Sequence, residues 1–302
     1  MNRRTNWTGN FVVTVTPFTE GGEIDESMVR RLVDIYAEEG ADGLVVAGST
    51  GEYFSLSDDE RVRLFRLVAD QNRGRLKLIA GTTEISTRRA VALTEAARVA
   101  GYDGALVLPP PYVLPTTREV FAHFEALDEV GLPLMLYNNP ARTGVNLDAT
   151  YLERLFPLKR FVAFKDSVKD IGQASATLRR FRDEIAVFPG MESYLVPSLQ
   201  RGAAGVVSMA PNVMGAEAIS LFRLAQGGQS AEIALVQERI DRLYARMYAG
   251  DYNPYVILKE SMRILGRPGG WTRDPLLPMS APDREALRTL LQEIGARLPK
   301  AA

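Results

Sequence analysis

The sequence predicts an α/β fold, a (β/α)8 barrel of the TIM type with a C-terminal helical appendage. Three observations predict it: short apolar runs alternate with segments of helical periodicity, eight such pairs follow one another at even spacing, and the alternation stops near residue 226. Strands that are buried on both faces and joined by helices form parallel sheets, and eight consecutive units close into a barrel. An open doubly wound sheet is the alternative fold.

The predicted strands are apolar runs of four or five residues, each bounded by a more polar segment. They cover residues 11–15, 43–47, 76–80, 104–108, 132–136, 161–164, 185–188 and 204–208. The predicted helices cover residues 26–39, 57–72, 86–100, 117–130, 148–155, 170–182, 193–201 and 212–226. Ser27 is the predicted N-terminal cap of the first helix, and SDDE at 57–60 predicts a capping box for the second.

The chain is expected to have two parts, a barrel catalytic domain at 1–226 and a helical segment at 227–302 that packs on it. In the second part, amphipathic runs at 231–250 and 283–298 predict helices. The Pro- and Gly-rich connector at 266–282 is too short to form another globular unit.

Composition excludes several classes of function. The chain has 302 residues, of which 36 are basic and 37 acidic, so its net charge of −1 gives no general attraction for nucleic acid or an anionic membrane. It contains no cysteine and one histidine, so thiolate chemistry and thiolate metal sites are excluded. No apolar signal core or membrane-length apolar run occurs, and the expected location is cytoplasmic.

The carboxyl ends of the strands are where a barrel carries its site. The sixth predicted strand, FVAF, leads directly into Lys165 and Asp166. Such a lysine can extend to solvent beside Asp166, or it can attack a carbonyl and form a Schiff base. The second role requires a neutral amine, which a walled barrel mouth favours because desolvation penalises the ammonium.

Two further candidates follow the fifth predicted strand, in YNNPARTG at 137–144. Tyr137 is expected within hydrogen-bond reach of Lys165, because the fifth and sixth strands are neighbours. It either relays protons or packs as a structural tyrosine. Arg142 is a candidate clamp for a substrate carboxylate, or else a solvated surface group.

The sequence GSTGE at 48–52 follows the second predicted strand. Gly48 and Gly51 let backbone amides approach a bound anion, while Ser49 and Thr50 add hydroxyl groups. A structural turn explains the same pattern.

Four of these segments together resemble a known group of enzymes. GSTGE, PPPYVLPT at 109–116, YNNPARTG and FKDS at 164–167 are similar, in this order and spacing, to motifs of the dihydrodipicolinate synthase/N-acetylneuraminate lyase superfamily. The resemblance covers nearly the whole chain. It implies a class I aldolase mechanism, without a metal or an organic cofactor, in which Lys165 forms an imine with pyruvate or a related 2-oxo acid.

The same resemblance implies roles for individual residues. Backbone amides of the Ser49–Thr50 turn bind the carboxylate of the 2-oxo acid, Tyr137 transfers protons, and Ser49 belongs to a hydroxyl relay. Tyr112 completes that relay across a subunit interface, which implies a homo-oligomer, usually a tetramer built as a dimer of dimers. Gly190 and Val207 line the pocket.

The resemblance leaves the second substrate, an aldehyde or sugar acid, open. Arg142 is similar to the arginine that engages an acidic partner in the synthases, whereas GSTGEYFSL is closer to lyases and sugar-acid enzymes. Glu192 and Ser193 are polar groups suited to a hydroxylated substrate. The expected function is a dihydrodipicolinate synthase-like lyase. The alternatives are a 2-keto-3-deoxy sugar acid aldolase or dehydratase and a hydroxyproline-pathway deaminase.

Two more distant functions remain. A barrel that binds a phosphate or flavin would carry its phosphate contacts after strands seven and eight, where GMES and SMAPNVMG place an acid and no basic cradle. A non-catalytic paralogue is disfavoured by the presence of Lys165, Tyr137, Tyr112 and Ser49. His123, inside the fourth predicted helix, is expected to be a packing or surface residue.

Overall fold

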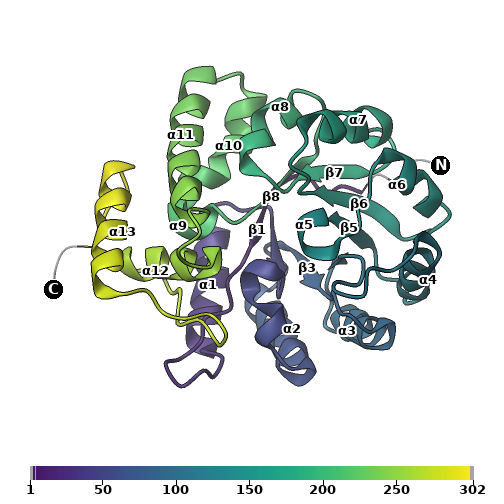
Figure 1. Cartoon of the computed structure of the whole chain (residues 1–302), viewed down its shortest axis with the longest axis horizontal. Helices are drawn as coiled ribbons and strands as arrows, with labels where there is room; N and C mark the ends of the chain where they lie inside the picture. Colours follow the sequence, from purple (N-terminus) through teal and green to yellow (C-terminus); the bar gives the residue numbers. More distant parts are fainter. Residues whose placement is uncertain (1–2, 4, 300–302) are drawn as a thin grey trace.

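The computed structural model describes residue 3 and residues 5–299, apart from the side chain of Glu192. Eight strands surround a common axis and the helices cover their outer face (Figure 1). The strands are β1 Gly9–Val13, β2 Gly43–Val46, β3 Lys77–Gly81, β4 Gly104–Val107, β5 Leu134–Asn138, β6 Phe161–Asp166, β7 Ala186–Pro189 and β8 Gly205–Ser208.

The strands pair in the order β7-β6-β5-β4-β3-β2-β1-β8, and neighbouring strands in this order are parallel. The two ends of this order also approach each other, since the backbone N–H of Ala204 donates to the carbonyl oxygen of Val187 at 2.8 Å. The barrel is therefore nearly closed, as predicted. A doubly wound sheet is excluded because its strand order would reverse at a switch point.

The covering helices match the predicted ones to within a few residues. They are α1 Glu26–Glu38, α2 Asp58–Asn72, α3 Thr87–Val99, α4 Thr117–Asp128, α6 Ala149–Leu155, α7 Ile171–Phe181, α8 Leu195–Leu199 and α10 Ala216–Gln226. Three short helices that were not predicted follow the carboxyl ends of strands, namely η1 Ser49–Gly51, η2 Tyr53–Ser55 and α5 Pro140–Thr143. The predicted helices at 193–201 and 212–226 are each divided in two, with η3 Glu192–Tyr194 ahead of α8 and α9 Pro211–Met214 ahead of α10.

Of the two predicted helix caps, one is confirmed and one is wrong. Ser57 and Glu60 form the predicted capping box of α2. The cap of α1 is Asp25 and not Ser27: the Asp25 carboxylate accepts from the backbone N–H of Met28 at 3.0 Å. Asp25 has the extended backbone that a cap requires, whereas Ser27 already lies in the first helical turn and donates its hydroxyl to Asp25 at 2.7 Å.

The barrel interior is filled by side chains that alternate strand by strand. At its amino-terminal end, the Trp7 ring lies against Gly104, where an added Cβ would come within 2.3 Å of the indole. Phe11 and Phe188 meet edge to face above it, with ring centroids 5.4 Å apart. These aromatic rings close the bottom of the barrel, so a ligand enters from the carboxyl ends of the strands.

The chain ends in three helices, α11 Ser230–Met247, α12 Pro254–Ile264 and α13 Ala281–Glu293. In Figure 1, α12 lies beside α1 and α9 at one side of the barrel, and α13 packs against the outer side of α12. The connector after α12 returns to the barrel, where the Trp271 N–H donates to the carbonyl oxygen of Phe18 at 2.8 Å. No helix of the described residues is long and apolar enough to cross a membrane.

Candidate active site

Lys165 and Tyr137 lie side by side on neighbouring strands. The register of β5 and β6 places Tyr137 opposite Lys165, and the Lys165 Nζ is 4.3 Å from the centroid of the tyrosine ring. Both side chains are only 6% exposed. The structure therefore brings the amine and the phenol together inside the barrel, and Lys165 is not a solvent-exposed lysine.

The strands extend further than the sequence predicted, and this extension orients the site. Lys165 and Asp166 belong to β6, while Tyr137 and Asn138 belong to β5. Because successive side chains point to opposite faces, Asp166 and Asn138 point away from the interior and bond to each other at 3.0 Å. Burial raises the pKa of Asp166 to about 6, against the hydrogen bonds from Asn138 and Val168.

Ser167 and Asn139 hold the phenol and were missed by the sequence analysis. The Asn139 amide donates to the Tyr137 oxygen at 3.0 Å, and the Ser167 hydroxyl lies 3.5 Å from it, at the outer limit of a hydrogen bond. Asn139 follows Tyr137 by two positions, and Ser167 follows Lys165 by two positions. The strand period of two was the signal that could have identified them.

The charge and hydrogen bonds around Tyr137 favour its ionised form. Burial raises the pKa of Tyr137, but the positive charge of Lys165 and the hydrogen bonds from Ser167 and Asn139 outweigh it. The net pKa lies below the usual value for tyrosine. A phenol with a lowered pKa releases its proton more readily than an isolated tyrosine, and the resulting phenolate can take a proton back.

Gly190, at the end of β7, leaves space for the lysine. An added Cβ there would lie 2.8 Å from the Lys165 Cε and 2.1 Å from the Ser167 Oγ. Val207 of β8 is buried in the same interior cluster as Tyr137. The described backbone places Glu192 at the start of η3, but its side chain lies outside the described part of the structure.

The segment 48–52 forms a tight turn above β2. Ala47 and Glu52, at its two ends, both have φ of 55° in the left-handed region. The Thr16 hydroxyl donates to the carbonyl oxygen of Gly51 at 2.8 Å and supports the turn from below. Thr50 is buried, and Ser49 at the start of η1 is half-buried.

Tyr255 of α12 reaches this turn, although sequence reasoning gave it no role. It shares a hydrogen bond with Ser49 and interacts electrostatically with Tyr137 and Arg142. Burial raises the pKa of Tyr255 and keeps its phenol protonated. A residue from the C-terminal segment therefore belongs to the rim of the barrel mouth.

Arg142 and Tyr112 are both exposed, in the segments that follow β5 and β4. Arg142 is in α5 and interacts electrostatically with Tyr53 as well as Tyr255, which places it at the same rim. Tyr112 is 86% exposed and has φ of 74°, so within one chain its ring points away from the buried groups.

Known proteins identify the family of this chain. The sequence profile of the Dihydrodipicolinate synthetase family matches residues 6–294. The chain belongs to this family. Its members are lyases and synthases of the class I aldolase type, and this chain is an enzyme of that class.

Two curated relatives show the range of similarity within the dihydrodipicolinate synthetase family. An uncharacterized DapA-like lyase of Rhizobium meliloti is 41% identical over 298 residues, covering 99% of this chain and 98% of that protein. A 4-hydroxy-tetrahydrodipicolinate synthase of Moorella thermoacetica is 34% identical over 290 residues, covering 96% and 99%.

Solved structures in the family share the whole fold. Dihydrodipicolinate synthase from Aquifex aeolicus superposes with a TM-score of 0.90 at 31% identity, covering 97% of this chain and 100% of that chain. YagE, a prophage protein of the family from E. coli K12 in complex with pyruvate, superposes with a TM-score of 0.92 at 26% identity, covering 96% and 99%.

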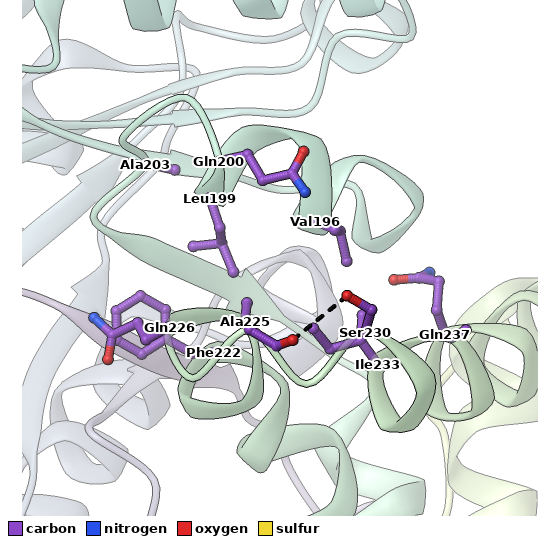
Figure 2. A pocket seen from close by; sticks show the side chains of 12 residues that line it. Val196, Leu199, Gln200, Ala203, Phe222, Ala225, Gln226, Ser230, Ile233 and Gln237 are labelled. Atoms are coloured by element: carbon purple, nitrogen blue, oxygen red, sulfur yellow. Dashed lines mark hydrogen bonds between the residues drawn. The ribbon is translucent and has the colours of Figure 1, made fainter.

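A large cavity elsewhere has none of this chemistry. A space of about 440 Å³ opens on the outside of the barrel between α8, α10 and α11 (Figure 2). Apolar side chains, glutamines and Ser230 line it, and none of its lining residues carries a charge. Among the described residues, no group of three or more His, Cys, Asp or Glu side chains could hold a metal ion.

Proposed function

We propose that Lys165 forms a Schiff base with the keto carbon of pyruvate or a related 2-oxo acid, and that the enzyme makes or breaks a carbon–carbon bond by aldol chemistry. One observation carries the proposal: a buried amine lies beside a buried phenol at the carboxyl ends of adjacent barrel strands. The complex of the related YagE with pyruvate supports this choice of first substrate.

The proposed first stage joins the amine to the ketone. The neutral Lys165 nitrogen attacks the keto carbon. The nitrogen then releases one proton and the keto oxygen takes one up, which gives a neutral carbinolamine. That hydroxyl then leaves as water when a second proton reaches it, and a protonated imine remains. Tyr137 gives and recovers these protons, with Ser49 as the proposed neighbour in the hydroxyl relay.

The substrate carboxylate is proposed to bind at the 48–52 turn. Backbone N–H groups of Gly48, Ser49 and Thr50 start the short helix η1 at the barrel mouth. Amide groups in such a turn form an anion-binding concavity. Gly190 and Val207 line the opposite side of the pocket, where the absence of a Cβ at Gly190 leaves room for the adduct.

The proposed second stage uses the imine as an electron sink. Loss of a proton from the adjacent carbon gives an enamine, which attacks an aldehyde. The reverse sequence cleaves the bond, and water then releases the 2-oxo acid from Lys165.

For the second substrate, 4-hydroxy-tetrahydrodipicolinate synthase activity is the first candidate. Relatives with that activity are 34–36% identical to this chain over most of its length. Arg142 at the rim is the proposed clamp for the acidic partner. The hydroxyls of Ser49 and Tyr255 beside it favour the alternative, a 2-keto-3-deoxy sugar acid or hydroxyproline-pathway substrate, for which Glu192 is a further proposed contact.

We also propose a homo-oligomer in which Tyr112 enters the relay of a second copy, as a tight dimer or a dimer of dimers. Tyr112, Val113 and Leu114 are all exposed hydrophobic residues, with exposures of 86%, 52% and 68%. Such a loop tip is suited to burial against another subunit. A cytoplasmic location and a domain boundary at residue 226 remain predictions.

Borohydride reduction tests the Schiff base directly. The enzyme is incubated with pyruvate, reduced and mapped by peptide mass. The expected adduct is on Lys165. The control variant Lys169→Ala, which changes an exposed lysine four positions further along the chain, keeps that adduct. An adduct elsewhere, or no adduct, refutes the proposal. Aspartate semialdehyde and 2-keto-3-deoxy acids then separate the candidate second substrates.

A further inference from the structure

A second buried lysine lies just outside the proposed site. Lys259 of α12 forms an ion pair with Glu52, the last residue of the 48–52 turn. The exposures of the two side chains are 2% and 0%. This pair joins the C-terminal segment to the turn that is proposed to bind the substrate carboxylate.

The Lys259 ammonium also joins two other segments. It donates to the carbonyl oxygens of Thr16 and Trp271, each at 2.7 Å, and lies 4.4 Å from the centroid of the Phe18 ring. The ion pair with Glu52 is a third polar contact of the same nitrogen. Thr16 in turn supports the carbonyl oxygen of Gly51, so the ammonium is connected to the turn by two routes.

The turn needs such support because its ends are strained. Ala47 and Glu52 are not glycines, yet both have φ of 55°. Residues in this region persist when surrounding contacts fix them. The second carboxylate oxygen of Glu52 accepts from the backbone N–H of Arg273 at 3.2 Å, so Glu52 is held from two sides by the C-terminal segment.

The same helix also contacts the start of the turn. Tyr255 precedes Lys259 by four positions, and residues at this spacing lie on one face of a helix. Tyr255 bonds to Ser49 and stacks on Phe54, with ring centroids 6.3 Å apart. One face of α12 therefore contacts the turn at Ser49 and at Glu52.

Folding stability alone is a poor reason for this arrangement. A buried ion pair loses the solvation of both charges, and apolar residues of similar volume at such positions are often equally or more stabilising. Fixed polar geometry at the edge of a binding site is a better account of the pair.

We propose that Lys259 and Glu52 are positioning residues that hold the 48–52 turn in the geometry that binds the substrate carboxylate. This inference rests on the proposed function, since it assumes that the turn receives that carboxylate. It assigns α12, outside the barrel strands and their loops, a direct part in substrate affinity.

The test measures how much pyruvate half-saturates borohydride trapping at Lys165. In Lys259→Met, we expect this concentration to rise by about tenfold or more, because a displaced turn weakens the hold on the carboxylate. The trapping rate at saturating pyruvate is expected to stay within about twofold, since Lys165 and Tyr137 are unchanged.

Arg267→Met is the matched control. Arg267 follows α12 and pairs with Glu39 at 2.6 and 2.9 Å, so its loss also removes an ion pair of the C-terminal segment. Within the described part of the chain, Arg267 forms no hydrogen bond or ion pair with the 48–52 turn, and the half-saturation of this variant should equal that of the wild type. Glu52→Gln, which keeps the shape of the side chain, provides the same readout if Lys259→Met does not fold.

The outcomes separate the two proposals. If the wild type is trapped at Lys165 and both pair variants keep its half-saturation, the pair is only structural and the inference is wrong. A rise of equal size in Arg267→Met contradicts it as well. If the wild type is not trapped at all, the proposed function itself fails, and the inference fails with it.

Discussion

Two buried lysines of this chain differ in what surrounds their nitrogens. Lys165 is 6% exposed and faces the ring of Tyr137. Among the described residues, no carboxylate forms an ion pair with its nitrogen, in contrast to Lys259. Lys259 is 2% exposed and contacts one carboxylate and two carbonyl oxygens.

If both proposals hold, the acceptors around the nitrogen, more than its burial, separate the nucleophilic lysine from the positioning one. An ammonium held by two carbonyl oxygens and an ion pair has no lone pair available for attack. An amine beside a phenol can exchange a proton and then attack a carbonyl. Burial lowers the pKa of Lys259 to about 8, and the charge of Glu52 opposes that shift.

The largest expected effect is on turnover. Lys165→Ala should reduce turnover by at least about a thousandfold, because the covalent step has no other nucleophile at the site. Steady-state assay with the identified substrates measures it, and thermal unfolding confirms that the variant is folded. Retained turnover would remove the distinction between the two lysines.

The next effect separates the phenol from the amine. Tyr137→Phe keeps the ring but removes the proton carrier, and it should lower kcat by about 100-fold or more. Trapping at Lys165 should continue at a reduced rate. Tyr194→Phe, whose phenol instead bonds to the carbonyl oxygen of Lys169, is the control and should be unchanged. Equal rates in both variants would rule out Tyr137 as the proton carrier.

The ion pair has its own effect on stability. Lys259→Met alone leaves Glu52 buried without its cation and should lower the free energy of unfolding by about 3–5 kcal/mol. The double variant Lys259→Met, Glu52→Leu should recover most of that loss but not the affinity for pyruvate. Chemical denaturation measures the first quantity, and a double variant with restored affinity would contradict the positioning role.

The smallest effect concerns a third buried base, His123. Its side chain is 2% exposed, and burial lowers its pKa to about 4. In the unfolded chain this histidine takes up a proton near pH 6.5, whereas in the folded protein it does so only near pH 4. The unfolded state therefore binds the extra proton between these values, and the folding stability present above pH 6.5 is lost as the pH falls towards 4. The loss from this residue is about 3 kcal/mol.

A comparison with His123→Asn isolates that loss. The variant should gain about 3 kcal/mol relative to the wild type between pH 7 and pH 4. Asp166 acts in the opposite direction, because its pKa is raised to about 6, but it is present in both proteins and cancels. A constant difference between the two unfolding curves across this range would show that His123 is not buried as a neutral base.

The sequence predicted the barrel and the pairing of Lys165 with Tyr137, because both follow from apolar runs and from adjacent strands. It placed the ends of β5 and β6 too early, since polar residues in a buried strand interrupt the apolar pattern that marks it. His123 was expected to be either a packing residue or a surface residue, and it is buried.

Contacts made by α12 could not be predicted in this way. Lys259 lies in α12, between the two amphipathic runs that the sequence analysis singled out, and Glu52 lies at the end of a predicted turn. Only the packing of the C-terminal segment against the barrel brings them together. The same holds for Tyr255 and Ser49, which the sequence separates by most of the chain.

The most direct measurement of the central claim is the structure of the enzyme after soaking with pyruvate. The account predicts a continuous covalent link from the Lys165 Nζ to the keto carbon, the carboxylate against the 48–52 turn, and an unmodified Lys259. An intact, unlinked pyruvate beside Lys165, together with turnover that survives Lys165→Ala, would contradict it.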